Sequence, residues 1–164
     1  MARRITTRLF TILVLLLLVG CDHASKGIAK ATLEVGGARE LLGGLVDLRY
    51  VENTDIAFNL LRWVPEPVRF PLLIVSGAVA VLAMCLLLFR ARETSGMPML
   101  ALILLTAGAI GNYLDRLLRG YVVDFIDVGR WPVFNVADAY LTLGLVLVVW
   151  GYSTSFRRPA TPSS

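Results

Sequence analysis

The sequence contains few of the side chains that metal sites and disulfides require. Only two cysteines and one histidine occur among its 164 residues. Cys21, His23 and Cys85 follow no metal-binding spacing, and three such residues do not complete a usual zinc site. We therefore expect no metal ion and no other cofactor.

Charged residues are also scarce. They make up 17% of the chain, against 57% hydrophobic residues, and the mean hydropathy is +0.72. A water-soluble domain of this length does not need so much apolar surface, so the composition predicts a single-domain membrane protein. The net charge of +4 does not form a basic stripe interleaved with aromatic residues, so no nucleic acid partner is expected.

Four apolar segments are long enough to cross a bilayer as helices. They cover about residues 8–28, 68–89, 98–118 and 133–152. The predicted fold class is an all-α membrane protein, with one integral domain over residues 1–164. Cys21 and Cys85 then lie toward opposite membrane faces, so no disulfide is expected. A short polar tail, residues 159–164, is expected to be disordered.

Basic residues predict the orientation of these spans. Seven of them lie in flanks that four spans place on one side, and Glu93 is the single acid there: Arg3, Arg4, Arg8, Arg90, Arg92, Arg157 and Arg158. The positive-inside rule makes that side cytoplasmic, so both termini are expected in the cytoplasm. Every Asp then falls near or beyond the outer face.

The outer region of about residues 30–66, between the first and second helices, has a different pattern. Gly36-Gly37 and Gly43-Gly44 interrupt it. Leu45 to Val51 combines an alternation of apolar and polar residues with β-branched and aromatic side chains. This pattern predicts a strand or two. We expect a small extracytoplasmic β-rich region that lies on the membrane surface.

The first apolar segment also fits a signal peptide, because a basic flank precedes it. Leu18-Val19-Gly20-Cys21 resembles the site at which bacterial lipoproteins are lipidated and cut. Three more spans follow, however, and the apolar run continues through Ile28. We favour an uncleaved helix in which Cys21 is a small buried residue, and keep a lipoprotein as an alternative.

Asp124 and Asp138 are the candidate catalytic pair. Asp124 follows the third helix and Asp138 lies in the first turns of the fourth, so both reach the outer edge. Two neighbouring carboxylates share a proton, and one then acts as a base toward water while the other acts as an acid. The alternatives are a helix N-terminal acid behind an Asn135 cap, for Asp138, and a solvated loop charge, for Asp124.

Other polar residues share helix faces with this edge. Asn112, Asp115 and Arg116 stand at i, i+3 and i+4 with Gly108 a turn earlier, which also fits simple helix packing closed by an Asp to Arg pair. Asp22 and Lys26 stand at i and i+4 and could form only an interfacial ion pair. A Ser25 and Lys26 dyad is disfavoured, because helical neighbours do not face each other. Asn53 could orient a peptide backbone, although a turn is the default interpretation.

Together these residues resemble the lipoprotein signal peptidase family, the membrane aspartic proteases called signal peptidase II. The most specific match is Gly108-Ala109-Ile110-Gly111-Asn112-Tyr113-Leu114-Asp115-Arg116, and the matches run in order from Asp22 to Asp138. The resemblance implies an endopeptidase of the bacterial cytoplasmic membrane. It would remove signal peptides from prolipoproteins just before a diacylglyceryl-modified cysteine, at the extracytoplasmic face, without a metal, and would be inhibited by globomycin. We expect a monomer surrounded by membrane lipids.

By this resemblance Asp124 and Asp138 are catalytic, and a second set lines the site: Asn53, Asn112, Arg116 and Asn135. A third set supports it: Asp22, Lys26, Gly108, Asp115 and Ala137. The chain departs from the family at Asp55-Ile56, where Gly-Ala is usual, which concerns substrate range or inhibitor sensitivity. Asp127 and Arg130 are expected to be surface residues. The non-enzymatic alternative is a small transporter or channel subunit, which the nearly apolar second and fourth helices disfavour.

Overall fold

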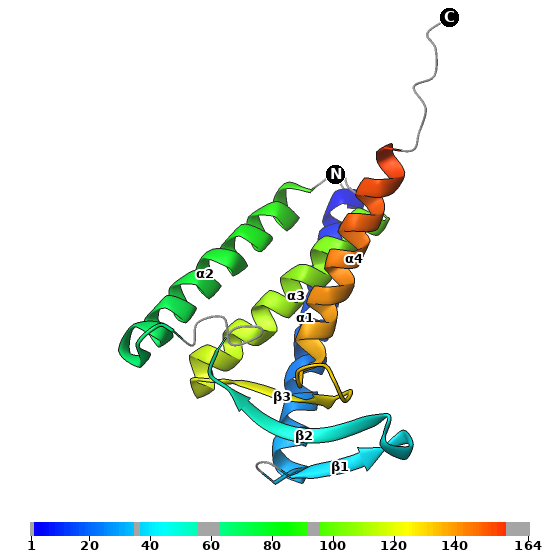
Figure 1. Cartoon of the computed structure of the whole chain (residues 1–164). Coiled ribbons are helices and arrows are strands. Elements are labelled where there is room, and N and C mark those ends of the chain that lie inside the picture. The colour runs from blue at the N-terminus through cyan, green and yellow to red at the C-terminus, as the bar shows by residue number, and fades with distance from the viewer. Residues whose placement is uncertain (1, 35–36, 56–62, 92–95, 157–164) are drawn as a thin grey trace, which may run out of the picture.

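Four long helices form the body of the protein. The structure is a computed structural model that describes residues 2–34, 37–55, 63–91 and 96–156. The helices are α1 (Ala2–Thr32), α2 (Glu66–Arg90), α3 (Met97–Arg119) and α4 (Val136–Phe156), and each contains a stretch long and apolar enough to cross a membrane. The beginning of α1 and the end of α4 lie at the same end of the molecule (Figure 1). The predicted four-helix fold class is confirmed.

Two helix boundaries differ from the prediction for physical reasons. Helix α1 runs from Ala2 to Thr32, so it is longer than the predicted span of about residues 8–28 at both ends. At its outer end the helix continues through the polar residues that follow the apolar run. Helix α4 begins at Val136, three residues after the predicted start. Phe134 forms an isolated β-bridge with Ile126, which keeps the preceding backbone extended, and the helix starts only after it. The predicted disordered tail lies outside the described residues.

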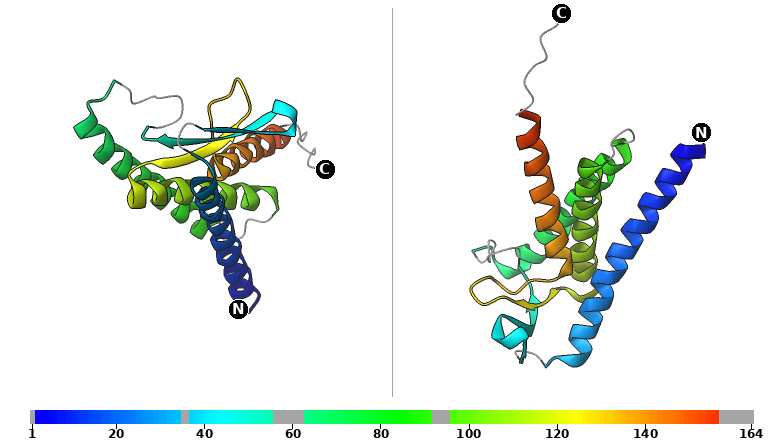
Figure 2. Two further views of the ribbon diagram at one scale, coloured as in Figure 1. Left: turned by 90° about the horizontal axis from the view of Figure 1, so that it is seen from below. Right: turned by 90° about the vertical axis from the view of Figure 1, so that its right-hand side faces the viewer.

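A three-stranded antiparallel sheet lies across one end of the helices (Figures 1 and 2). Strand β1 (Ala38–Leu41) and strand β2 (Val46–Asn53) lie between α1 and α2, as predicted, and are joined by a turn in which Gly43 and Gly44 have positive φ of 68° and 81°. Strand β3 (Val122–Asp127) follows α3 and pairs with β2. The prediction missed β3 as a strand, although its Val, Phe and Ile residues favour one.

The sheet is held on the helices by a small apolar core. Ala29 from the end of α1 packs with Tyr50 of β2 and with Val123 and Phe125 of β3. Tyr50 and Val123 are 2% and 0% exposed, so this core excludes water at the point where the sheet meets α1. It fixes β3 relative to the helices, and β3 carries Asp124.

Helix α3 is the central helix, and glycines allow its close approach to α4 and α1. A Cβ at Gly108 would lie 2.5 Å from the Ala137 carbonyl oxygen, and one at Gly111 would lie 2.6 Å from Asp22 Oδ2. Among the described residues α2 packs against α3 alone, with Gly77 beneath the Tyr113 ring. The beginning of α4 is therefore pressed against α3, whereas α2 contacts the other described helices only through α3.

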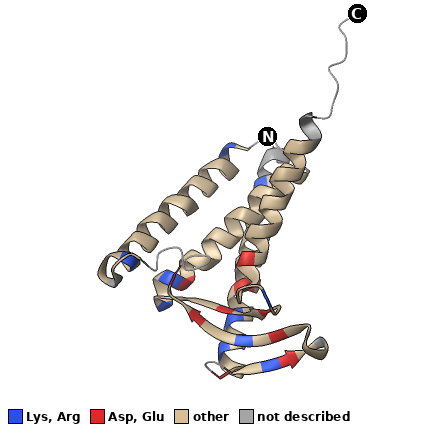
Figure 3. Ribbon diagram, viewed as in Figure 1, with Lys and Arg blue, Asp and Glu red and all other residues tan. Residues whose placement is uncertain are grey.

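Charged residues are distributed unevenly along the helices. The described acidic residues lie toward the sheet end of the molecule (Figure 3). Cys21 lies in the middle of the continuous α1 and is exposed, so the expectation that it is buried is wrong.

Candidate active site

Two carboxylates meet where β3 and α4 adjoin. Asp124 is 2% exposed on β3, and Asp138 is half-buried in the first turn of α4. Asn135 connects them: its Nδ2 donates to Asp124 Oδ1 over 2.6 Å, and its backbone N–H donates to Asp138 Oδ2 over 3.2 Å. Asn135 Oδ1 accepts from the Asp138 backbone N–H at 3.0 Å, which is a reciprocal helix cap. The capping alternative for Asp138 therefore holds together with its place beside Asp124.

The remaining carboxylate oxygens are held by two other amides. Asn53 Nδ2 donates to Asp124 Oδ2 at 2.8 Å, and Asn112 Nδ2 donates to Asp138 Oδ1 at 2.7 Å. Asn53 reaches Asp124 because β2 pairs with β3 in a register that places Val51 opposite Asp124. Every oxygen of the two carboxylates thus accepts a hydrogen bond. The solvated-loop alternative for Asp124 is wrong, because the residue lies in a paired, buried strand.

The environment of Asp124 favours its protonated form. Burial raises the pKa of this carboxyl from its ordinary 3.8 to about 6. The Asn53 and Asn135 hydrogen bonds and the Lys26 charge lower the pKa, while the Asp138 charge raises it, and burial outweighs them. Such a carboxyl exchanges its proton close to neutral pH, as an acid–base catalyst must.

The free energy of unfolding should depend on pH because of this raised pKa. The folded protein binds the Asp124 proton more tightly than the unfolded chain does. The stabilisation from protonated Asp124 is therefore greatest below pH 3.8 and is lost as the pH rises through about 6. We expect the unfolding free energy of the unsubstituted protein, relative to Asp124→Asn, to fall by about 2 to 3 kcal/mol between pH 4 and 7. Thermal unfolding of both proteins in detergent measures it, and a pH-independent difference would contradict the assigned cause.

Arg116 lies over the same site but is not the partner of Asp115. Its Nη2 donates to the Asp55 backbone oxygen at 3.0 Å and its Nη1 to the Asn112 backbone oxygen at 3.3 Å. The backbone N–H of Asp55 donates to Asn53 Oδ1 at 2.9 Å. These contacts use the backbone of Asp55. They therefore do not depend on its carboxylate side chain, which replaces the glycine that is usual in the family. Ile56 lies outside the described residues.

The alternative in which Asp115 pairs with Arg116 to close the helix is wrong. Asp115 Oδ1 instead binds Arg119 at i+4, and its Oδ2 accepts from the Val123 backbone N–H at 3.3 Å. Adjacent helical residues diverge by about 100°, whereas residues four apart share a face. Asp115 therefore joins α3 to the start of β3.

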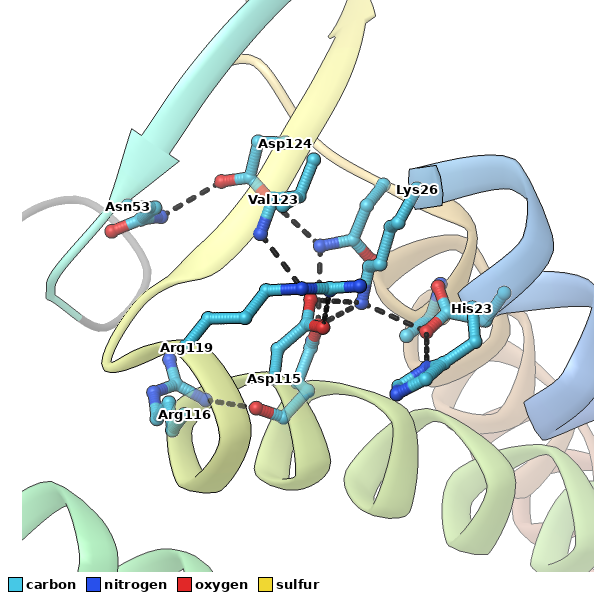
Figure 4. Close-up of polar contacts among 12 residues, drawn as sticks. His23, Lys26, Asn53, Asp115, Arg116, Arg119, Val123 and Asp124 are labelled. Atoms are coloured by element: carbon cyan, nitrogen blue, oxygen red, sulfur yellow. Dashed lines mark hydrogen bonds and ion pairs between the residues drawn. The ribbon is translucent and has the colours of Figure 1, made fainter. Parts of the chain in front are cut away.

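A buried ion-pair cluster lies behind the two carboxylates (Figure 4). Lys26 Nζ lies 2.8 Å from Asp22 Oδ2 and 3.0 Å from Asp115 Oδ2, and all three side chains are 0% exposed. Asp22 Oδ1 accepts from the Ala137 backbone N–H at 2.9 Å. The alternative of a merely interfacial Asp22–Lys26 pair is wrong, since these charges are enclosed and connect α1, α3 and α4.

Residues singled out in the sequence thus fall into two groups. The carboxylate pair, its amides and the buried cluster come together, with Gly108 and Ala137 at the contact between α3 and α4. Asp127 and Arg130 lie apart from them. Arg130 is exposed as expected, but Asp127 is buried, because it accepts from the Gly129 backbone N–H at 3.0 Å and pairs with Arg49 at 3.4 Å. In the described parts of the chain, no three His, Cys, Asp or Glu side chains are grouped as a metal site.

Both carboxylates line one cavity of about 570 Å³ between α2, α3 and α4. One end holds the acids with Asn53, Asn112 and Arg116, and the other walls are mostly apolar or small. The wall residues come from α2, α3, β3, α4 and the segment before α4: Leu73, Ser76, Gly77, Ala80, Ala109, Tyr113, Val122, Trp131, Pro132, Val133, Phe134, Leu141 and Thr142. Sequence reasoning missed them, although Leu141 and Thr142 stand at i+3 and i+4 from Asp138, a spacing that places them on its helix face.

Comparisons with known proteins identify the family of this chain. The family model described as Signal peptidase (SPase) II matches residues 14–154. A lipoprotein signal peptidase of Fusobacterium nucleatum is 35% identical over 86% of this chain and 82% of its own, and one of Streptococcus pyogenes is 36% identical over 87% and 91%. One of Caldicellulosiruptor bescii is 42% identical over 67% and 69%.

Solved structures show the same architecture. A bacterial membrane enzyme determined in meso at 2.3 Å superposes with a TM-score of 0.79, at 25% identity over 94% of both chains. A second, at 1.9 Å, gives 0.73 at 27% identity, covering 87% of this chain and 92% of the other. Together with the family match, these likenesses show that the chain is a multi-pass membrane peptidase that belongs to the lipoprotein signal peptidase (signal peptidase II) family.

Proposed function

We propose that the protein is an aspartic endopeptidase that cuts diacylglyceryl-modified prolipoproteins just before the lipidated cysteine. The observation that carries this proposal is the pair Asp124 and Asp138, joined through Asn135 at the polar end of a largely apolar cavity. A substrate with a peptide and two acyl chains needs such a site: polar groups for the scissile bond, and apolar walls for the lipid.

The pair supplies both proton transfers of peptide hydrolysis. With one shared proton, the ionised carboxylate takes a proton from water as the water oxygen bonds to the scissile carbonyl carbon, and the other carboxyl protonates the carbonyl oxygen. Collapse of this tetrahedral intermediate breaks the C–N bond. The proton held by the first carboxyl passes to the cysteine amine, and the second carboxylate takes back a proton from a hydroxyl of the intermediate, which restores the shared-proton state. Asp124 and Asp138 are therefore the proposed catalytic residues, and no metal or other cofactor takes part.

The other polar residues have supporting roles in this proposal. Asn53, Asn112 and Asn135 hold the carboxylate oxygens, and Arg116 lies where it can bind the substrate backbone. The large buried cluster around Lys26 and the close contact at Gly108 support the site from behind. Globomycin, a cyclic peptide, would compete for the same cavity.

The cavity suggests how a membrane-bound substrate enters. Its walls from α2 and α4 lie across from each other, and among the described residues those two helices do not pack together. A lipid-anchored peptide can therefore reach the acids sideways from the bilayer. The basic flanks favour cytoplasmic termini, so we place the acids at the extracytoplasmic face of the bacterial cytoplasmic membrane, where exported prolipoproteins present their cleavage sites. A monomer would suffice for this chemistry.

Purified protein in detergent tests the proposal. We expect it to cleave a prolipoprotein that bears diacylglyceryl cysteine, with mass spectrometry placing the new N-terminus at that cysteine. The same precursor without lipid should be cut much more slowly, because its acyl chains no longer fill the apolar walls. Absence of cleavage, together with proton or ion flux in reconstituted vesicles, would favour the transporter alternative instead.

A further inference from the structure

Lys26 is the most completely enclosed cation of the described structure. Its ammonium group has three protons and no acceptor. It donates to Asp22 Oδ2 at 2.8 Å and to Asn112 Oδ1 at 3.1 Å, and it forms an ion pair with Asp115 Oδ2 at 3.0 Å. Figure 4 shows the Lys26 side chain reaching from α1 toward α3, with Asp115 beneath it. The position of the ammonium is therefore fixed from three directions.

The hydrogen bond from Lys26 Nζ to Asn112 Oδ1 determines which way the Asn112 amide faces. Because an ammonium can only donate, the amide end beside Lys26 must be the oxygen. The nitrogen at the other end then faces Asp138, to which it donates at 2.7 Å. Asn135 Nδ2 also donates to Asn112 Oδ1, at 3.1 Å. A reversed amide would oppose N–H groups to two donors and would leave Asp138 Oδ1 facing an oxygen.

We propose that Lys26 is a positioning residue that keeps the Asn112 amide turned toward Asp138 and so holds the pair Asp124 and Asp138 in its working arrangement. This inference rests on the proposed function. Lys26 also holds Asp22, whose second oxygen binds the Ala137 backbone N–H next to Asp138 in α4. One buried cation on α1 thus controls both the amide that donates to Asp138 and the helix turn that carries it.

A purely structural role is the competing explanation. In that case Lys26 only neutralises Asp22 and Asp115, and its contact with Asn112 is incidental. The two explanations differ in what happens to catalysis when the charges are balanced without Lys26. They also differ in pH dependence, because the cation stabilises ionised carboxylates nearby.

Charged and titratable groups near the acid pair come from three parts of the chain. They are Asp22, His23 and Lys26 on α1, Asp55 after β2, and Asp115, Arg116 and Arg119 on α3. Removal of Lys26 together with one carboxylate leaves the net charge unchanged but takes away the cation nearest to Asn112. Asp124 and Asp138 should then ionise at higher pH, which displaces the whole pH–rate profile to higher pH.

The test compares two variants that differ only at Lys26. Lys26→Met alone leaves Asp22 buried without its cation and leaves Asp115 with Arg119 alone, so we expect poor folding from it. Lys26→Met/Asp115→Asn avoids this excess of negative charge, and Asp115→Asn alone is its control. We expect the double variant to show about 10- to 100-fold lower kcat than the control, with little change in KM, and a pH–rate profile displaced to higher pH.

Equal kcat and the same pH–rate profile in the double variant and its control would overturn the proposal, even if the double variant melted at a lower temperature. Both proteins are compared per folded molecule, using size-exclusion profiles and thermal unfolding. Failure of the proposed function has another signature, since the unsubstituted protein would then not cleave lipidated prolipoprotein. The two failures are therefore distinguishable in one series of assays.

Discussion

Asp124→Asn and Asp138→Asn should each abolish prolipoprotein cleavage, with a loss of about 10⁴-fold or more in kcat. Each substitution removes one of the two carboxyl groups, and an amide neither accepts a proton from water nor donates one to a carbonyl oxygen. The pair acts as a unit, so the double variant should be little worse than either single one. Cleavage of a lipidated precursor, followed by mass spectrometry over long incubations, measures these losses.

Asp127→Asn is the matched control for these variants. Asp127 is also a buried carboxylate of β3, but it pairs with Arg49 and does not line the cavity. Its substitution should weaken the strand end and leave kcat within a few-fold of the unsubstituted protein. If Asp127→Asn were inactive too, damage to β3 would explain the loss in Asp124→Asn. If either catalytic variant kept turnover, the shared-proton mechanism would be excluded.

The sequence indicates the spans and their polar ends well because these features are local. A span needs only a run of apolar residues of sufficient length, and Asp22 and Lys26 share a helix face because they are four residues apart. The Asn135 cap and Asp138 also follow from short spacing. Spans, shared helix faces and caps form in any fold that contains the helix, so the order of residues alone predicts them.

The site itself depends on contacts that residue order does not show. Lys26 reaches Asn112 across 86 positions, and Asp22 reaches the Ala137 backbone across 115. Neither contact leaves a periodic pattern, and the resemblance to a family names such residues without saying which atoms meet. The strand β3 was missed for a related reason. Its residues favour a strand, but only pairing with β2 decides between a strand and a short apolar loop.

Asn135 combines two functions that substitution can separate, because its side chain both caps α4 and donates to Asp124. Asn135→Ala should lose both, with about 1 kcal/mol less stability and about 100-fold or greater loss of kcat. Asn135→Ser keeps a hydroxyl that can cap the helix, but it has no amide long enough to replace the 2.6 Å bond to Asp124 Oδ1. We expect Asn135→Ser to recover stability and not activity.

Thermal unfolding and cleavage rates of the two Asn135 variants decide between capping and bridging. In the bridging interpretation, Asp124 Oδ1 loses its partner in a buried site, and the two acids are no longer held by a common residue. Activity then stays low in both variants while stability differs. Recovery of activity in Asn135→Ser would mean that the cap alone positions Asp138, and that the amide contact with Asp124 is dispensable. One side chain thus makes both the cap that begins α4 and the bridge to Asp124.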